Sequence, residues 1–576
     1  MKNRVKDAGA DELASVRKQS RPYYWFVGIF SFFVNLLMLT GPLYMLQVYD
    51  RVLGSRSEAT LLALTALVVF LYGMMGILDY ARGRVMARVA ARFQAALDMR
   101  VFDAVIRRSA VKQDELAATG LKDLEAVQRF IGSPVLMALF DLPFTPLFIA
   151  GIFVFHAWLG YLAIFGGLIL VVITLLNTTL SRNPTLKSNR AVLLAEQTSE
   201  QIRLDAETVQ AMGMRGAAFN RWDKARSEAL SGQISTNDLV GTFTTMTKSF
   251  RMLLQSAMLG LGAYLVLQNE LTAGAMIAGS ILMGRALAPI ELAVGQWPLV
   301  TRARKGWDNL SELLGEMPQE PTRTALPKPR ALLEVQQLTV VPPGEQQASL
   351  RLVSFDLRPG HAIGVIGSSG AGKSTLARAI TGVWRPAGGR IRLDGATLDQ
   401  YDEDLGKHIG YLPQRVSLFD GTIAENIARL AETPDPQKIV EAAKKADAHE
   451  MILKLPKGYD TRVTATGGRL SGGQMQRIGL ARAMYGDPVI LVLDEPNSNL
   501  DNEGSEAVNA AIRRLKEEGK SVLIMAHRPA AIRECDQLLM LEHGARVAFG
   551  PKDEVLRSQV KNHEQITRHA GPGGVR

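Results

Sequence analysis

Cysteine is nearly absent from this sequence. Cys535 is the single cysteine among 576 residues. One thiol excludes an intrachain disulfide framework and any metal site built from several cysteines. A reducing, cytosolic compartment is therefore expected for the soluble part of the chain. The length exceeds what one hydrophobic core supports, so about two to four domains are expected.

The N-terminus lacks the pattern of a removable signal peptide. Its first 22 residues, "MKNRVKDAGADELASVRKQSRP", are polar and run into a long apolar stretch without a small-residue cleavage site. A patch of interleaved basic and aromatic residues is also lacking, although the net charge is +10 and the pI is about 9.5. The Lys and Arg residues instead flank apolar runs, as in cytoplasmic loops of membrane proteins. A lipid bilayer, and no nucleic acid, is the expected partner.

Long apolar runs fill the first half of the sequence. Most approach the roughly 20 residues that cross a hydrocarbon core, and their small residues suit close helix packing in lipid. A large buried helical core is the alternative, but repeated uncharged runs of this length are typical of membrane helices. The predicted spans are residues 23–45, 61–78, 135–155, 159–180, 245–267 and 271–287.

Basic residues gather at one end of these runs. The N-terminal segment, residues 82–129 and residues 182–248 are rich in Lys and Arg, whereas the turns near Trp158 and Asn269 have none. The positive-inside rule therefore predicts six spans with both ends in the cytoplasm. The two basic segments between spans have a helical pattern, which predicts membrane helices that continue into the cytosol as long arms.

Two charged residues fall inside the predicted spans. Asp141 follows the start of the third span, and Arg285 lies within the sixth. Charges at membrane depth usually face a partner or a wet cavity, although both side chains would also reach the headgroups by snorkelling. A pairing of Asp141 with Arg285 is one hypothesis.

Proline divides the sequence. Four prolines in "MPQEPTRTALPKPR" cannot continue a helix and predict an extended linker. The predicted organisation is a short cytoplasmic segment (1–22), a transmembrane domain (23–315), the linker (316–330), an α/β ATPase domain (331–560) and a C-terminal tail (561–576).

A phosphate-binding loop opens the second half. "HAIGVIGSSGAGKSTLARAITG" reads as an apolar strand, a glycine turn and a helix, the setting in which G-x-x-x-x-G-K-[ST] holds a triphosphate. Backbone N–H groups around Gly370 and Gly372 are expected to wrap the phosphates. Lys373 would neutralise the β and γ oxygens, and Ser374 would bind Mg²⁺. The predicted nucleotide-binding residues are Gly367, Ser368, Ser369, Gly370, Ala371, Gly372, Lys373, Ser374 and Thr375.

A second apolar strand ends in two carboxylates. In "VILVLDEP", the strand places Asp494 and Glu495 at the edge where open α/β sheets bind ligands. Asp494 is expected to hold Mg²⁺ through its water shell. Glu495 is expected to polarise the attacking water. A helix cap is the simpler explanation for an acidic pair after a strand, but the nearby phosphate loop favours catalysis.

Two further side chains follow apolar strands. Gln414, in "YLPQRVSLFDGTIAENI", suits a contact with Mg²⁺ or water. His527 closes "VLIMAHRP" and is expected to donate a hydrogen bond to the γ-phosphate. A lone histidine after a strand is more often structural, yet its expected place beside Asp494 favours the functional interpretation.

A second glycine turn, "LSGGQMQRIGLARAM", begins a further helix. Ser471 is expected to cap that helix, and Gly472 and Gly473 leave N–H groups open at its positive end. This arrangement predicts a second anion site. Because one compact domain cannot easily wrap one nucleotide with both sites, the second site is expected to complete the phosphate loop of another copy.

These motifs together resemble a known family. "GSSGAGKST", Gln414, "LSGGQ", "VILVLDEP", "SNLD" and His527, in this order, are similar to the ATPase domain of ATP-binding cassette (ABC) transporters over residues 331–560. The resemblance implies two ATP molecules held between two such domains. It implies that Ser471, Gly472, Gly473 and Gln474 contact ATP across the interface, and that Asp501 links the two sites.

The membrane half resembles a narrower group. "PLYMLQVYDRVLGS", "DLPFTPLF" and "GAYLVLQNELTAGAMIAGSILMGRALAPIE" are similar to PrtD-like ATPases of type I protein secretion systems. The resemblance implies a homodimer in the bacterial inner membrane that exports unfolded polypeptide, with a periplasmic adaptor and an outer-membrane channel. It also implies an uncleaved C-terminal signal on the substrate, because about 22 residues precede the first span and leave no room for a leader-cleaving protease domain.

Two positions depart from the family pattern, and two other functions stay open. Pro342 stands near the position of the aromatic residue that usually stacks on adenine, and Ala465 or a neighbour replaces a glutamate expected before "LSGGQ". A lipid or drug exporter of the same architecture is the first alternative. A soluble ATPase acting on DNA is the second, and the apolar spans argue against it.

Overall fold

The computed structural model describes two compact units. It covers residues 2–112, 114–320, 324, 326–401, 404–464, 470–498, 500, 502–526 and 528–559. Residues 1–109 and 113–319 form the first unit, called the membrane unit below. Residues 320–576, with 110–112, form the second, called the ATPase unit.

The membrane unit is built from helices. In its described part, six helical segments are long and apolar enough to cross a membrane, as predicted: Arg21–Ser55, Glu58–Val111, Pro134–Phe155, Ala157–Leu204, Arg215–Leu267 and Ala273–Gly295. The helices are α1 (Lys2–Gln19), α2 (Arg21–Leu37), α3 (Thr40–Gln47), α4 (Leu53–Ser55), α5 (Glu58–Val111), α6 (Glu115–Ile131), α7 (Pro134–Asp141), α8 (Thr145–Phe155), α9 (Ala157–Leu204), α10 (Ala206–Ala211), α11 (Arg215–Leu267), α12 (Ala273–Gly295) and α13 (Trp297–Glu316).

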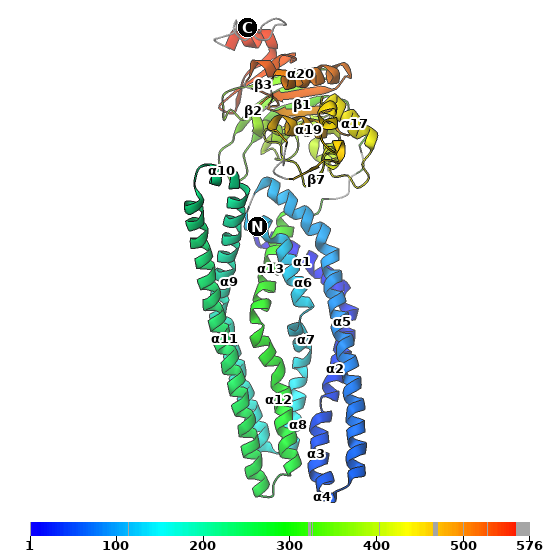
Figure 1. The fold of residues 1–576 in the computed structure, drawn as a ribbon, viewed down its shortest axis with the longest axis vertical. Coiled ribbons are helices and arrows are strands. Elements are labelled where there is room, and N and C mark those ends of the chain that lie inside the picture. Colours follow the sequence, from blue (N-terminus) through cyan, green and yellow to red (C-terminus); the bar gives the residue numbers. More distant parts are fainter. Residues whose placement is uncertain are drawn as a thin grey trace. The chain divides into compact units, whose positions relative to one another are not determined.

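Three helices run far beyond a bilayer. Helices α5, α9 and α11 have 54, 48 and 53 residues, or roughly 70–80 Å at 1.5 Å per residue. The predicted cytosolic arms are thus continuous with the spans. Figure 1 shows α9 and α11 side by side, with α4 and the α11–α12 turn at one end of the unit and α6 and α10 at the other. This agrees with a topology in which the basic segments share one side.

Glycines set the closest helix contacts. A Cβ at Gly262 of α11 would lie 2.6 Å from Met276 Cγ of α12, so the glycine lets these helices pack closely. The polar N-terminal segment is an ordered helix, α1, which packs on α13. A Cβ at Gly9 would lie 2.0 Å from the Ser311 carbonyl oxygen. Leu13 is fully buried at this contact, and the Arg17 guanidinium lies 5.5 Å from the Trp307 ring centroid.

The ATPase unit is an α/β structure. Its central sheet has the order β12-β11-β3-β10-β9-β6, in which all pairs except β11–β12 are parallel. An antiparallel sheet, β2-β1-β4-β5, and a β7–β8 pair complete the strands. The strands are β1 (Leu333–Val340), β2 (Leu350–Leu357), β3 (Ala362–Ile366), β4 (Gly388–Leu393), β5 (Ala396–Thr397), β6 (Ile409–Leu412), β7 (Gly421–Thr422), β8 (Arg462–Val463), β9 (Ile490–Asp494), β10 (Ser521–Met525), β11 (Gln537–Glu542) and β12 (Ala545–Pro551).

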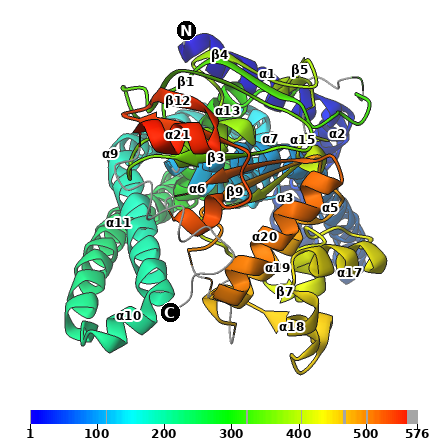
Figure 2. The same cartoon turned by 90° about the horizontal axis from the view of Figure 1, so that it is seen from above.

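Helices cover this sheet and form a separate lobe. In Figure 2, α17, α18 and α19 gather on the side of the ATPase unit away from β4 and β5. The helices are α14 (Lys373–Ile380), α15 (Leu405–His408), α16 (Ile423–Ile427), α17 (Pro436–Lys445), α18 (His449–Leu453), α19 (Gly472–Met484), α20 (Asn502–Glu517) and α21 (Lys552–Gln559).

Buried apolar strands make the core of this unit. All residues of β9 and β10 are buried, as their runs of Ile, Leu and Val predict for strands covered on both faces. Cys535 lies in this core with 3% of its surface exposed, and burial raises the pKa of its thiol to about 12. The single cysteine is therefore a structural residue.

Candidate functional site

The phosphate loop joins β3 to α14. Residues 367–372 form the loop, and Lys373, Ser374 and Thr375 make the first turn of the helix. Gly370 and Gly372 have φ angles of +80° and +98°, which L side chains rarely adopt. Lys373 is 6% exposed, and its ammonium group donates to the carbonyl oxygens of Gly367 and Ser368 at 2.9 Å each. The loop thus holds a buried cation beside open backbone N–H groups.

Two of the three residues predicted to bind Mg²⁺, Ser374 and Asp494, lie together. The Ser374 hydroxyl donates to Asp494 Oδ1 at 3.2 Å, although 120 residues separate them in sequence. Burial raises the pKa of Asp494, which is 3% exposed, while the Ser374 hydrogen bond opposes that rise. A hydroxyl and a carboxylate are oxygen donors of the kind Mg²⁺ accepts, with phosphates and waters filling the remaining positions. The pair therefore fits this ion.

Gln414 contacts Glu495 directly. Strands β6 and β9 are neighbours, so the side chains that follow them meet at one sheet edge. The Gln414 amide donates to Glu495 Oε2 at 2.9 Å. Glu495 has a left-handed backbone (φ +53°), which costs about 1–3 kcal/mol for a non-glycine residue. Its N–H donates to the Met525 carbonyl at 3.0 Å, and this bond to the end of β10 holds the conformation.

A further glutamine supports this turn, and the sequence analysis missed it. Gln476 lies in α19 and is 2% exposed. Its amide donates to the Pro496 carbonyl and, at 3.5 Å, to the Glu495 carbonyl. It therefore fixes the turn that carries Glu495 to the helix that follows the second glycine turn. Gln476 falls in mid-helix, where nothing in the local pattern distinguishes it from a surface residue.

The second glycine turn caps α19 as predicted. The Ser471 hydroxyl accepts from the Gln474 N–H at 3.2 Å, and Gln474 Oε1 accepts from the Ser471 N–H at 2.9 Å. This capping box leaves the N–H groups of Gly472 and Gly473 at the positive helix end. Among the described residues, no hydrogen bond or ion pair joins 470–474 to 367–375.

Three predicted positions lie outside the described residues. They are His527, Asp501 and Ala465. Pro342, the other position that departs from the family pattern besides Ala465, is described and buried, and its carbonyl accepts from the Glu345 N–H at 3.1 Å. Pro342 thus makes a turn beside β1.

The charged residues of the membrane unit correct one hypothesis. Asp141 pairs with Arg82 of α5, at 2.6 Å and 3.2 Å from its two oxygens, and accepts from Asn35 of α2 at 2.7 Å. Arg285 is exposed, and no ion pair joins it to Asp141 in the described structure. The predicted pairing is therefore wrong. The sequence offered several arginines, and only the packing of α2, α5 and α7 selects Arg82.

Comparisons with known proteins cover both units. The ABC transporter profile matches residues 350–498, and the ABC transporter transmembrane region profile matches residues 24–288. The type I secretion system ATP-binding protein PrsD of Rhizobium meliloti (strain 1021) is 44% identical over 567 residues, covering 98% of this chain and 97% of that protein. The toxin RTX-I translocation ATP-binding protein of Actinobacillus pleuropneumoniae is 28% identical over 555 residues, covering 92% and 75%.

A solved structure shares the fold. A bacterial Atm1-family ABC exporter with ATP bound matches with a TM-score of 0.78 at 22% identity, over 97% of this chain and 99% of that one. The predicted fold class is confirmed: a six-span helical transmembrane domain with long helical extensions, fused to an α/β ABC ATPase domain. The protein is a multi-pass membrane protein that binds and hydrolyses ATP. The chain belongs to the ABC transporters of type I secretion systems.

Proposed function

We propose that this chain is the ATP-driven permease of a type I secretion system and exports unfolded polypeptide across the bacterial inner membrane. The observation that carries this proposal is 44% identity to PrsD, a type I secretion system ATP-binding protein, over nearly the whole chain. Two more distant relatives are named for the translocation of toxin RTX-I and of leukotoxin. A lipid or drug exporter lacks comparable support.

The ATPase residues divide into local roles. Glu495 polarises the attacking water, and Gln414, bonded to Glu495, senses the reacting centre. Residues 367–375 wrap the triphosphate, with Lys373 as the main cation. Ser374, Asp494 and Gln414 would hold Mg²⁺, which would supply charge neutralisation at the phosphate oxygens. His527 donates to the γ-phosphate.

A second copy completes each site. Ser471, Gly472, Gly473 and Gln474 form a helix N-terminus that makes no hydrogen bond to residues 367–375 in the described structure. This favours contact with ATP held by another copy. Asp501 links the two sites. ATP binding then closes the dimer, and loss of the γ-phosphate contacts reopens it.

The export route requires other proteins. We propose a homodimer that works with a periplasmic adaptor and an outer-membrane channel. We further propose a substrate whose C-terminal signal stays on the exported protein. The long arms α5, α9 and α11 carry the motion between ATP sites and spans.

Comparison of secreted proteins tests this function. Cells producing the wild-type chain or Glu495→Gln are grown under identical conditions, and the medium is analysed by mass spectrometry. One or a few proteins should disappear from the medium of the variant, each with its C-terminal sequence intact in the wild-type medium. An unchanged set of secreted proteins, together with altered lipid or drug efflux, would favour the other exporter classes.

A further inference from the structure

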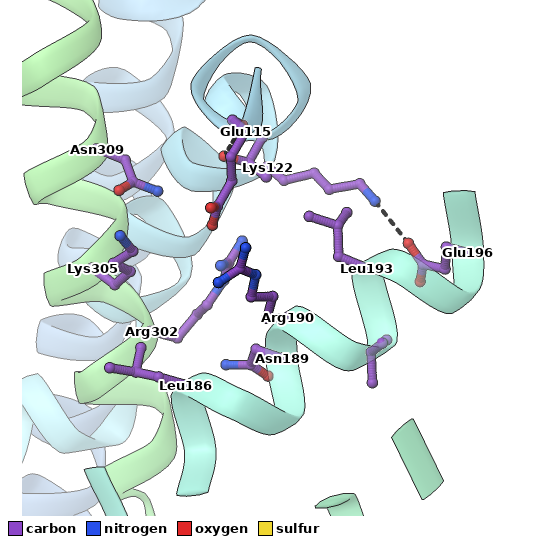
Figure 3. Close-up of a pocket in the computed structure, with 12 residues that line it drawn as sticks. Glu115, Lys122, Leu186, Asn189, Arg190, Leu193, Glu196, Arg302, Lys305 and Asn309 are labelled. Carbon is purple, nitrogen blue, oxygen red and sulfur yellow. Dashed lines mark hydrogen bonds and ion pairs between the residues drawn. The ribbon is translucent and has the colours of Figure 1, made fainter. Parts of the chain in front are cut away.

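Helices α6, α9 and α13 of the membrane unit line a basic cavity. It has a volume of about 200 Å³. Four cationic side chains and two acidic ones line it: Lys122, Arg190, Arg302, Lys305, Glu115 and Glu196. Figure 3 shows Arg190 reaching in from α9, Arg302 from α13 and Glu115 from α6, while Lys305 lies close to α13.

Two of the cations already have partners. Lys122 pairs with Glu196 across the cavity at 3.1 Å. Arg302 lies 3.1 Å from Oδ1 of Asp123, a fully buried carboxylate behind the cavity wall. The other oxygen of Asp123 accepts from Thr119 and Asn309 at 2.8 Å each. This buried network fixes the wall from which Arg302 projects.

The other two cations are less well neutralised, although the Asp123 carboxylate also attracts Lys305 through space. No hydrogen bond or ion pair in the described structure involves Arg190 or Lys305. Glu115 lines the same cavity without an ion pair to either of them. After the internal pairs are counted, two cations face one carboxylate, so the cavity keeps a positive excess. Like charges that line one cavity are unfavourable unless an anion joins them.

The cavity continues along α9. A second cavity of about 530 Å³ shares Glu115, Arg190 and Leu193 with the first. Together they follow α9 from Leu186 to Gln197, which is roughly 16 Å of helix. An extended peptide of about five residues spans that length.

The position of the groove separates two sources of anions. Arg190 lies ten residues beyond Leu180, where the apolar run of α9 ends, and ten helical residues span roughly 15 Å. A lipid phosphate lies at the edge of the apolar layer, so a lipid headgroup does not reach Arg190. A polypeptide carboxylate arriving from the cytosol does.

We propose that Arg190 and Lys305 form a binding site for carboxylates of the exported polypeptide, either its C-terminal α-carboxylate or Asp and Glu side chains near it. This inference rests on the proposed polypeptide export. Charge-assisted bonds from an arginine and a lysine bind the carboxylate. Glu115 weakens binding by repulsion and thus disfavours strongly anionic segments.

Peptide binding to the purified, nanodisc-embedded chain tests the site. The probes are fluorescein-labelled Gly-Ser-Gly-Ser-Ala-Glu-Ala-Glu, its C-terminally amidated form, its Glu→Gln form, and the form with both changes. Binding is followed by fluorescence anisotropy. Weaker binding of the amidated peptide would identify the α-carboxylate as the bound group, and weaker binding of the Glu→Gln peptide would identify the side-chain carboxylates.

The variants are matched in charge. Arg190→Gln/Lys305→Gln removes the two less neutralised cations, and Arg182→Gln/Arg304→Gln removes two exposed ones from the same helices outside the cavity. The first pair should lower the affinity for the acidic peptide at least about tenfold, and the second should change it less than about twofold. Glu115→Gln should raise that affinity. A merely structural role of Glu115 does not predict such an increase.

Three outcomes would overturn the site. If both double variants lost the same amount of peptide affinity, general surface charge would explain the binding. Equal binding of the acidic and the doubly neutral peptide would leave polypeptide binding intact but remove the carboxylate site. Binding of no peptide by the wild-type chain would remove the site and weaken the proposed polypeptide export as well. ATPase activity of each variant without peptide should equal that of the wild type.

Discussion

The Gln414 side-chain amide donates a hydrogen bond to Glu495 Oε2 at 2.9 Å. This bond connects the loop after β6 to the turn after β9. The same turn is held by the hydrogen bond from the Glu495 N–H to the Met525 carbonyl and by the Gln476 side chain. The carboxylate thus has a fixed position and a neutral neighbour.

Removing the charge of Glu495 should stop turnover without stopping ATP binding. Glu495→Gln keeps the size of the side chain but cannot accept a proton, so kcat should fall by about 10²–10⁴-fold, the usual loss for a general base. ATP affinity should stay within a fewfold. Glu542→Gln, an exposed change at the end of β11, is the control. Undiminished ATPase activity in Glu495→Gln would contradict the catalytic role.

Placing a second carboxylate beside Glu495 should shift the pH dependence of the ATPase. In Gln414→Glu, like charges about 3 Å apart disfavour double ionisation and raise the pKa of the pair. Because the base acts when ionised, the acid limb of the kcat profile should move to higher pH by about one unit or more. Gln414→Ala should lower kcat without that shift. An identical acid limb in both variants would show that the two side chains do not interact in the working enzyme.

The cap of α19 can be kept while its anion site is lost. Aspartate caps helices as well as serine does, so Ser471→Asp should leave the melting temperature of the protein unchanged or slightly higher. Its carboxylate would repel a phosphate at the same helix end, and ATPase activity should fall roughly 10²-fold or more. Ser471→Ala should instead lower stability by about 1 kcal/mol. Full activity of Ser471→Asp would exclude a phosphate at this turn.

The ion pair of Arg82 and Asp141 should contribute strongly to the membrane unit. The Arg82 side chain is 7% exposed and the Asp141 side chain 13% exposed. Without Arg82, Asp141 would keep only the neutral Asn35 amide, and such an uncompensated buried charge typically costs about 3–5 kcal/mol. Without Asp141, Arg82 would keep its ion pair with Asp79 at 2.6 Å, so this loss should cost less. Arg82→Leu should lower the detergent melting temperature sharply and Asp141→Leu should lower it less, and the double variant should be less destabilised than their sum.

Arg285→Gln serves as the control for that pair, because Arg285 is exposed and is not ion-paired with Asp141 in the described structure. A small change is expected. If Arg285→Gln proved as destabilising as Asp141→Leu, the pairing seen here would not be the one that matters for stability.

The contact of α1 with α13 should not tolerate a methyl group. Gly9→Ala would place Cβ 2.0 Å from the Ser311 carbonyl, and such overpacking typically costs about 1–3 kcal/mol. Gly28→Ala in α2 meets no atom within 4 Å and should stabilise the helix by about 0.5–1 kcal/mol. The loss of stability in Gly9→Ala and the gain in Gly28→Ala can be measured by melting temperature and by the rate of protease cleavage within α1. Equal melting temperatures of Gly9→Ala and Gly28→Ala would contradict the close contact of α1 with α13.

The sequence predicted what depends on local pattern. The phosphate loop, the carboxylates after β9 and the cap at Ser471 follow from strand, glycine and helix order, and the parallel sheet then brings Ser374 to Asp494. Pairings between residues on helices that are distant in sequence could not be predicted. Arg82 and Asp141 are 59 residues apart, and nothing local selects this arginine. Gly9 likewise shows its role only against the backbone of α13.

The length of α5, α9 and α11 has a mechanical consequence. A continuous helix bends little, so a slight tilt imposed on one tip displaces the opposite tip by a distance that grows with helix length. A change of a few degrees at the end of such a helix would therefore move its opposite end by several ångströms, and Pro184 inside α9 is the place where this transmission would be weakest.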